Sequence, residues 1–292
     1  MPQPLISITG STGTVGGMVA ARLADQGANL RLIVRDPSKA PPIAGVDLAT
    51  ASDYSATEEM TEALRGSDTL FLVSGREAEN RLEQHYSAID AAVAAGVSRI
   101  VYTSFLGAAP DATFTLARTH YATEQALIQS GMAYAIQRQS LYLDFMPFMA
   151  GQDGVIRGPA GDGRFAPVAR TDVADVAVAL LDDDSLDGQI YNVTGDERLS
   201  FRHIANRMTA LTGKAVEYVH ESEQEAYASR AHFGAPDWEV EGWVSSYLAV
   251  ATGEMDVVTD VVKKLTGHDP LSLDRYLAEN PDSWAHIEPS AL

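Results

Sequence analysis

Short apolar runs alternate with longer amphipathic stretches over the first half of the chain. Runs rich in β-branched residues predict parallel strands, and they lie at 5–9, 30–34, 69–73, 99–103 and 133–138. A further short strand is expected at 46–49. Helical periodicity predicts helices at 14–26, 56–65, 79–95 and 117–130. This alternation predicts an α/β fold with a doubly wound parallel sheet and right-handed crossovers.

The pattern changes beyond residue 140. Residues 141–149 are apolar and aromatic, 151–164 are glycine-rich and predict a loop, and a helix at 171–182 and a strand at 189–193 return to the sheet. The remainder is mostly helical, with one short strand at 216–219 and helices at 201–212, 221–233, 236–252, 256–266 and 271–279.

Two parts of the chain follow from this change. We predict a dinucleotide-binding domain at 1–150 and a smaller, mostly helical cap at 151–292, with 170–195 returning to the sheet. Ligands of doubly wound sheets bind beyond the carboxyl ends of the strands. The substrate site is therefore expected in a cleft between sheet and cap.

A glycine motif directly follows the first strand. Gly10, Gly13 and Gly16 would let the chain turn sharply, approach a pyrophosphate and pack the next helix against the strand. The phosphates would then lie at the N-terminus of helix 14–26, where free N–H groups favour an anion. This context predicts a Rossmann-type dinucleotide-binding fold; a structural turn in another α/β protein is the alternative.

Arg35 follows the second strand, where the adenosine ribose of a bound dinucleotide would lie. An arginine there can pair with a 2′-phosphate, which favours NADP(H) over NAD(H). Two alternatives stay open: Arg35 as a surface residue at the sheet edge, and Asp36 as the partner of a ribose hydroxyl.

Two further segments are candidate cofactor contacts. Asp53 and Tyr54 would lie near the adenine, or Asp53 would merely begin helix 56–65. Val73, Ser74 and Gly75 end the third long strand near the expected path of the pyrophosphate and nicotinamide ribose, although the glycine could serve only a turn.

The next strand ends in Thr103 and Ser104, whose hydroxyls would face the nicotinamide and its acceptor. Short-chain reductases place a Tyr-x-x-x-Lys pair on the following helix, and here Tyr121 is followed by Gln125. Without the ammonium group, Tyr121 is a poor candidate for the proton donor. His120 and Glu124 share one helical face and could form a hydrogen-bonded pair, with a solvated helix surface as the alternative.

Aromatic residues supply candidate substrate contacts. Phe105 follows Ser104, and Gln139, a candidate cofactor contact, ends the 133–138 strand. The aromatic candidates could be ordinary core or a flat wall that stacks an aromatic substrate against the nicotinamide. They are Phe105, Tyr142, Phe145 and Phe148, with Trp238 and Trp243 in the cap.

Composition narrows the possible functions. The formal charge of −19, from 40 acidic and 21 basic residues, argues against nucleic-acid binding. No apolar run is long enough for a membrane span, and the absence of cysteine and of paired histidines argues against a metal site. The first strand begins too early for a signal peptide, so a cytoplasmic protein is expected.

Several motifs in this order resemble the NmrA-like group of atypical short-chain dehydrogenases, and in particular its branch of type 2 quinone oxidoreductases and triphenylmethane reductases. The motifs are Thr9–Gly16, Val34–Pro37, Asp53–Tyr54, Tyr102–Ser104, His120–Glu124 and Leu265–Pro270. The resemblance covers nearly the whole chain.

The resemblance implies hydride transfer from NADPH to a quinone or dye-like acceptor, with His120 and Glu124 on the nicotinamide side. Such an acceptor needs little proton assistance, because its reduced form spreads negative charge over an aromatic system. The group also includes redox-sensing regulators and enzymes that tailor aromatic polyketides, and both remain alternatives. The implied cofactor contacts are Gly10, Thr12, Gly13, Thr14, Val15, Gly16 and Arg35.

Overall fold

The computed structural model describes residues 3–288, and the chain divides into two compact units. The first unit comprises residues 1–110, 119–138 and 173–192, and the second comprises 111–118, 139–172 and 193–292. Residues 139–150, which the sequence analysis placed in the first domain, therefore belong to the second unit.

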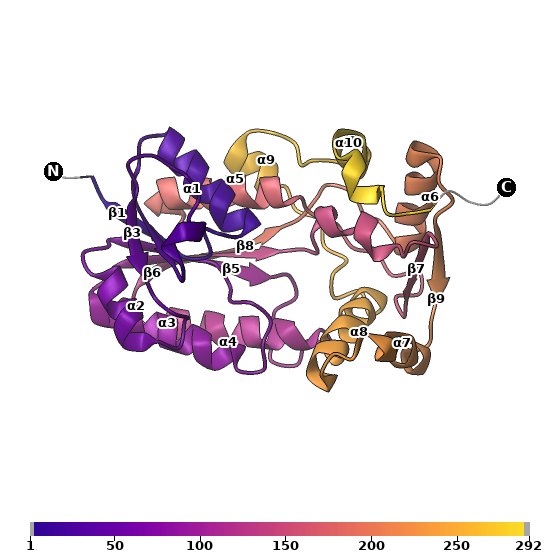
Figure 1. Cartoon of the computed structure of the whole chain (residues 1–292), viewed down its shortest axis with the longest axis horizontal. Helices are drawn as coiled ribbons and strands as arrows, with labels where there is room; N and C mark the ends of the chain where they lie inside the picture. Colours follow the sequence, from indigo (N-terminus) through magenta and orange to yellow (C-terminus); the bar gives the residue numbers. More distant parts are fainter. Residues whose placement is uncertain (1–2, 289–292) are drawn as a thin grey trace. The chain divides into compact units, whose positions relative to one another are not determined.

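A seven-stranded sheet organises the first unit (Figure 1). Its order is β3-β2-β1-β4-β5-β6-β8, and the pairs from β3 to β5 are parallel. This confirms the predicted doubly wound α/β fold. The strands are β1 (Leu5–Ile8), β2 (Asn29–Val34), β3 (Asp47–Thr50), β4 (Thr69–Leu72), β5 (Arg99–Phe105), β6 (Ala133–Gln139) and β8 (Gln189–Val193).

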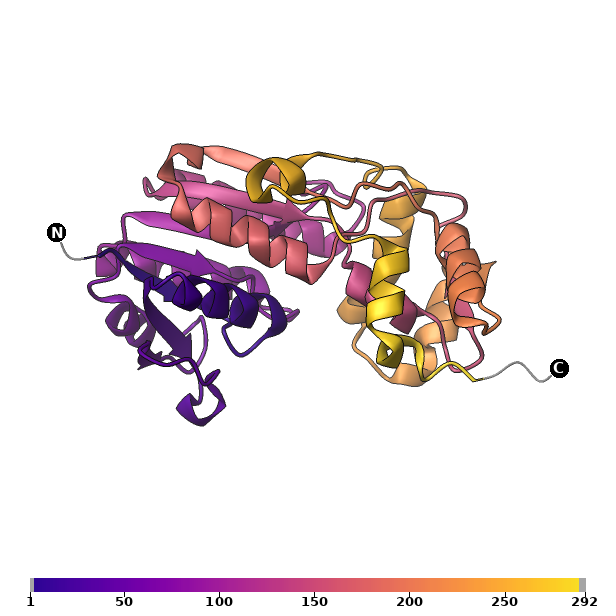
Figure 2. The ribbon, with the colours of Figure 1, turned by 90° about the horizontal axis from the view of Figure 1, so that it is seen from above.

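Helices cover both faces of this sheet. On one face lie α2 (Thr57–Leu64), α3 (Arg81–Ala95) and α4 (Thr115–Gln129). Their apolar sides bury a core around Tyr102, which is fully buried. On the other face α1 (Thr14–Asp25) and α5 (Arg170–Asp182) lie side by side (Figure 2), joined by a 2.9 Å ion pair between Arg22 and Asp175.

The second unit has a small sheet of its own. Strand β7 (Val155–Gly158) pairs in parallel with β9 (Glu217–His220). The prediction that 151–164 is a loop is therefore wrong at β7. Its glycines serve close packing: a Cβ on Gly154 would lie 2.2 Å from the Ala215 carbonyl oxygen, and one on Gly158 would lie 2.3 Å from the Tyr247 ring.

Helix α6, residues 201–212, has the predicted bounds, whereas the other four helices of the second unit are shorter than their sequence pattern suggested. The helix expected at 256–266 begins only at Val261, with Asp260 at its N-cap. Within this unit α6 packs against α10 (Figure 2). The helices are α6 (Phe201–Thr212), α7 (Glu223–Arg230), α8 (Asp237–Ala251), α9 (Val261–Thr266) and α10 (Leu273–Glu279).

Candidate functional site

The glycine loop between β1 and α1 has no room for side chains at two of its positions. Gly10 has φ +63°, and a Cβ there would lie 2.9 Å from the Cβ of Val73. A Cβ on Gly16 would lie 2.4 Å from the Gly10 carbonyl oxygen. The backbone of Gly13 donates to that same oxygen at 2.9 Å. The loop and the first turn of α1 are therefore packed backbone against backbone.

The start of α1 fits an anionic ligand. No side chain caps its N-terminus and its first turn holds no acidic residue, although both are common at such a position. The Ser11 hydroxyl beside it is buried without a hydrogen-bond partner in the described chain. Free N–H groups and an unused hydroxyl are the donors that a pyrophosphate requires.

A cavity of about 330 Å³ extends from this loop over the carboxyl ends of the strands. It gathers seven residues that the sequence analysis proposed as cofactor contacts: Gly10, Thr12, Arg35, Asp53, Tyr54, Ser74 and Gly75. Other residues that line the cavity, such as Arg76 and Gln84, were not predicted, because they belong to no recognisable sequence motif. Gly13 and Thr14 stand at the start of α1 beside the loop, and Val15 and Gly16 are buried in its first turn.

Arg35, like Arg76, is an exposed cation of this cavity. Its guanidinium donates no hydrogen bond within residues 3–288. The neighbouring carboxylate of Asp36 instead accepts from the backbone and hydroxyl of Ser38, at 3.0 and 2.7 Å, and caps the following turn. The other oxygen of Asp36, Oδ2, lies 4.0 Å from Lys39 Nζ, and the alternative in which it accepts from a ribose hydroxyl stays open.

Asp53 and Tyr54 line the same cavity. One oxygen of Asp53 accepts from the backbone and hydroxyl of Ser55. These hydrogen bonds hold the pKa of the carboxyl below its usual value. Tyr54 donates to the carbonyl of Val73 at 2.7 Å, and burial raises its pKa to about 12. Asp53 is therefore an anion and Tyr54 a neutral donor near pH 7.

A buried polar network lies between α3 and α4. Arg81 donates to His120 Nε2 at 2.9 Å, so the His120 proton is on Nδ1, which donates to the Tyr102 hydroxyl at 2.9 Å. His85 Nε2 accepts the backbone N–H of Gly75 at 2.8 Å, and its Nδ1 donates to Thr123 at 2.8 Å. Both imidazoles are thus neutral.

Ser104 and Glu124 form a separate buried group. The Ser104 hydroxyl donates to Glu124 at 2.5 Å, and Arg138 donates to both oxygens of that carboxylate, at 2.8 and 2.5 Å. His120 and Glu124 have different partners and do not bond to each other. The alternative of a solvated helix surface is wrong as well, since both side chains are buried. Tyr121 is half-buried next to them.

The two neutral histidines make stability depend on pH. Burial lowers the pKa of His85 to about 3, and burial beside Arg81 holds the pKa of His120 well below its usual range. An unfolded histidine titrates near pH 6.5, so the unfolded state binds more protons below that pH. The two neutral histidines therefore contribute fully to the free energy of unfolding above about pH 6.5, and this contribution is lost as the pH falls.

We expect urea unfolding to show a loss of about 2 kcal/mol per histidine between pH 7 and pH 5. Between pH 6 and 5, the slope of the unfolding free energy against pH should correspond to about two protons taken up on unfolding. In the variant His85→Gln it should correspond to about one. A slope unchanged by this substitution would contradict the assignment of a neutral His85.

The aromatic candidates of the second unit do not form ordinary core. Phe145 and Phe148 are 47% and 57% exposed. The Arg170 guanidinium covers the rings of Tyr142 and Phe145, at 4.9 and 4.1 Å from their centroids. Cation–π contact thus holds two of these rings in place.

The other aromatic and amide candidates have local partners. Gln139 donates to the Tyr142 hydroxyl at 3.2 Å, and Trp243 packs edge-on to Phe233. Trp238 is half-buried at the start of α8. In the first unit, Phe105 stacks on His120 with ring centroids 6.2 Å apart.

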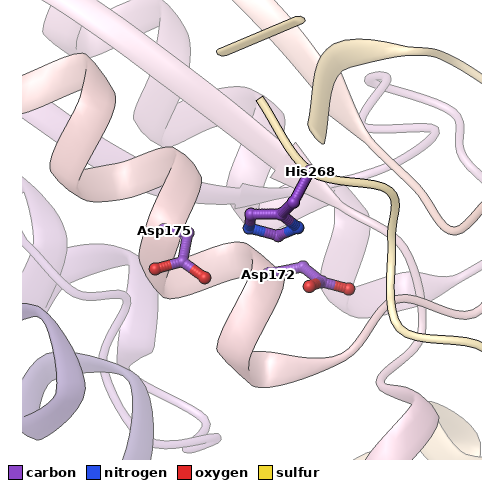
Figure 3. Close-up of side chains that lie close together, drawn as sticks. All are labelled: Asp172, Asp175 and His268. Atoms are coloured by element: carbon purple, nitrogen blue, oxygen red, sulfur yellow. The ribbon is translucent and has the colours of Figure 1, made fainter. Parts of the chain in front are cut away.

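Two carboxylates of α5 are already engaged by the fold. Figure 3 shows Asp172 and Asp175, one helical turn apart, together with His268. Asp172 accepts the backbone N–H of Leu271 at 2.8 Å, and Asp175 pairs with Arg22. Each of these carboxylates thus has a partner within the fold. No helix within residues 3–288 is long and apolar enough to cross a membrane.

Comparison with known proteins identifies the chain. A family model described as NAD(P)H-binding matches residues 10–184. Quinone oxidoreductase 2 of Escherichia coli K12 is 32% identical over 275 residues, which are 92% of this chain and 96% of that protein. The NAD(P)H azoreductase of Xenophilus azovorans is 28% identical over 267 residues, 90% and 93% of the two chains.

Solved structures agree with these relatives. The NADPH-dependent quinone oxidoreductase of Escherichia coli, complexed with NADPH, superposes with a TM-score of 0.87 over 94% of this chain and 99% of that one. The Citrobacter sp. triphenylmethane reductase complexed with NADP(H) is 28% identical, with a TM-score of 0.85 and the same coverage. This chain belongs to the NAD(P)H-binding, NmrA-like family of atypical short-chain dehydrogenases, and it is an NAD(P)H-dependent oxidoreductase.

Proposed function

We propose that this protein transfers a hydride from NADPH to a quinone or a similarly extended aromatic acceptor. The observation that carries the proposal is the cavity with Arg35 in its wall, in a chain 32% identical to a quinone oxidoreductase over 92% of its length. Bound NADPH would supply the hydride. The residues of this chain bind the dinucleotide, orient it and hold the acceptor beside it.

The preference for NADPH rests on Arg35. A guanidinium that donates no hydrogen bond within residues 3–288 can pair with a 2′-phosphate. One oxygen of the carboxylate next to it in the sequence, Asp36, already accepts from Ser38. The donors at the start of α1, with Thr12 and the Ser11 hydroxyl, suit the pyrophosphate.

Thr103 is the better of the two hydroxyls for contact with the acceptor. It accepts the backbone N–H of Ser74 at 2.7 Å, and no group of residues 3–288 accepts its own proton. Ser104 donates its single proton to Glu124. We therefore assign Thr103 to the acceptor oxygen, and Ser104 and Glu124 to the support of β5 and α4 beneath it.

A quinone fits the absence of a strong proton donor. His120 is neutral and its one proton is directed to Tyr102. Gln125 stands where a lysine would activate Tyr121. A quinone that accepts a hydride becomes a delocalised anion, so its proton can follow from solvent, and a cationic dye becomes neutral on hydride transfer and needs no proton.

The test is the loss of nicotinamide absorbance when the protein is mixed with NADPH and a panel of quinones and cationic dyes, with NADH in parallel. Turnover that favours NADPH is expected. Dinucleotide binding without turnover of any acceptor would contradict the proposal and would favour a sensor or a tailoring enzyme.

Replacement of Arg35 by alanine should weaken NADPH binding by about 10- to 100-fold, the value of one charge-assisted contact with a phosphate. Binding of NADH should change by less than about threefold, because NADH lacks the phosphate that this contact recognises. Titration calorimetry with both dinucleotides measures the difference. Arg76→Ala removes the same charge from the same cavity and serves as the control; equal losses for NADPH and NADH would refute the assigned role.

A further inference from the structure

The turn that follows β4, residues 73–75, is held by five side chains from four different segments of the chain. Ser74 and Gly75 line the cofactor cavity, so the position of this turn affects what binds there. The sequence marked the turn itself as a candidate contact. No sequence motif singled out Arg81 and His85, which bond to the backbone of this turn.

The first half of the turn is fixed on both sides. The backbone N–H of Val73 donates to Thr9 Oγ1 at 3.0 Å, and its carbonyl accepts from Tyr54 at 2.7 Å. The next backbone N–H, of Ser74, donates to Thr103 at 2.7 Å. Each of these three side chains comes from a segment at the carboxyl end of another strand of the sheet.

The Gly75 peptide is held by two residues of α3. Its N–H donates to His85 Nε2 at 2.8 Å, and its carbonyl accepts from Arg81 Nε at 3.0 Å. Arg81 and His85 are four residues apart, so they share one face of the helix, and both are buried. The Gly75 peptide is therefore bonded to two buried side chains.

The chemistry of His85 suits this task. Its Nδ1 donates to Thr123, whose own proton goes to the carbonyl of Thr119 at 2.7 Å, so Thr123 can only accept here. The proton of the neutral imidazole is thereby fixed on Nδ1, and Nε2 is left as an acceptor aimed at Gly75. A Cβ on Gly75 would lie 3.3 Å from that nitrogen, so glycine permits the close approach.

We propose that His85, with Arg81, is a positioning residue for NAD(P)H: it fixes the Gly75 peptide at the cofactor cavity and so presets the turn against which the dinucleotide binds. Pre-organisation of this kind raises affinity because the cost of ordering the turn is met during folding. The proposal concerns dinucleotide binding and is independent of the acceptor.

Two substitutions separate the two hydrogen bonds of His85. In His85→Gln, the side-chain oxygen reaches the place of Nε2 and can still accept from Gly75. In His85→Asn, the shorter amide reaches only the place of Nδ1, so the bond to Gly75 is lost. The readouts are the dissociation constants of NADPH and NADH, measured by fluorescence titration, and amide hydrogen exchange of the peptide containing Gly75 in the cofactor-free protein.

We expect His85→Asn to weaken the binding of NADPH and of NADH by about tenfold and to accelerate amide exchange at Gly75 at least about tenfold. For His85→Gln, we expect affinities and exchange close to those of the wild type. Equal affinities of the two variants would overturn the proposal. Loss of NADPH affinity with normal NADH binding would also overturn it, because that signature belongs to Arg35.

A histidine of the second unit provides the control for a general loss of stability. His203 closes a capping box with Ser200 at the start of α6. His203→Ala should lower the midpoint of thermal unfolding without changing either dissociation constant. Should His85→Asn fail to fold, Arg81→Lys keeps the charge but removes the Nε donor to the Gly75 carbonyl; wild-type affinity in that variant would equally refute the proposal.

Discussion

Replacing Gly16 by alanine should weaken NADPH binding by about a hundredfold or more. The added Cβ would lie 2.4 Å from the oxygen and 2.7 Å from the carbon of the Gly10 carbonyl, and 3.1 Å from the Ser11 nitrogen. All three are backbone atoms, so no side chain can rotate away. The loop must separate from the first turn of α1, at a cost of about 3 kcal/mol, which corresponds to roughly two powers of ten in affinity.

Gly17→Ala is the matched control. Its Cβ would lie 3.0 Å from the Ser11 carbonyl oxygen, 0.6 Å farther than the closest contact at Gly16. Alanine also has the higher helix propensity, by about 1 kcal/mol. We therefore expect binding and thermal unfolding close to wild type for Gly17→Ala. Circular dichroism and NADPH titration of both variants make the comparison; similar affinities for the two would show that the loop adapts to a side chain at Gly16.

The alternation of apolar runs and amphipathic stretches was sufficient to predict the sheet and its helices. Buried parallel strands need continuous apolar runs, and such runs are visible in one sequence. Strand β7 could not be found in this way. It has four residues, one of them glycine and one arginine, and it is held by pairing with β9, about 60 residues away. Long-range pairing of so short a segment leaves no local pattern.

The cofactor cavity was predictable to the extent that its residues follow strands. Gly10, Arg35, Asp53 and Ser74 stand one to three residues beyond strand ends, which meet at one edge of a parallel sheet. Arg81 and His85 were missed because they lie on a helix and act through the backbone of another segment. Their spacing of four residues on the buried face of α3 was the one available signal.

Side-chain partners were the least predictable feature of the site. The spacing of His120 and Glu124 allowed a pair between them, yet both bond to other residues. His120 bonds to Tyr102 on β5 and to Arg81 on α3. Glu124 bonds to Ser104 and Arg138 on the sheet. Contacts of this kind depend on the register of β5 and β6 beneath α4, which helical periodicity does not specify.

Replacing Glu124 by alanine should lower the free energy of unfolding by about 3–5 kcal/mol. The carboxylate has no exposed surface, and the Arg138 side chain that it pairs with is 19% exposed. Removal of the carboxylate leaves this guanidinium partly buried without its counter-charge and leaves the Ser104 hydroxyl without its acceptor. Urea denaturation at pH 7 measures the loss.

A double replacement tests whether the loss comes from the uncompensated charge. Glu124→Leu combined with Arg138→Leu removes both charges, and we expect it to recover most of the stability lost in Glu124→Leu alone. A loss of less than about 1 kcal/mol of unfolding free energy in Glu124→Leu would contradict the assignment of a stabilising buried ion pair.

The variant Glu124→Gln distinguishes a structural role of Glu124 from a role in proton transfer. The amide keeps the shape of the side chain and can still accept from Ser104, but it cannot serve as a general acid or base. A role in proton transfer would lower kcat by about 10²–10⁴-fold. Because the Ser104 proton and the Arg138 guanidinium already engage both carboxylate oxygens, we expect a loss of stability with a much smaller change in kcat. A drop in kcat within that range, at unchanged NADPH affinity, would instead place Glu124 among the reacting groups.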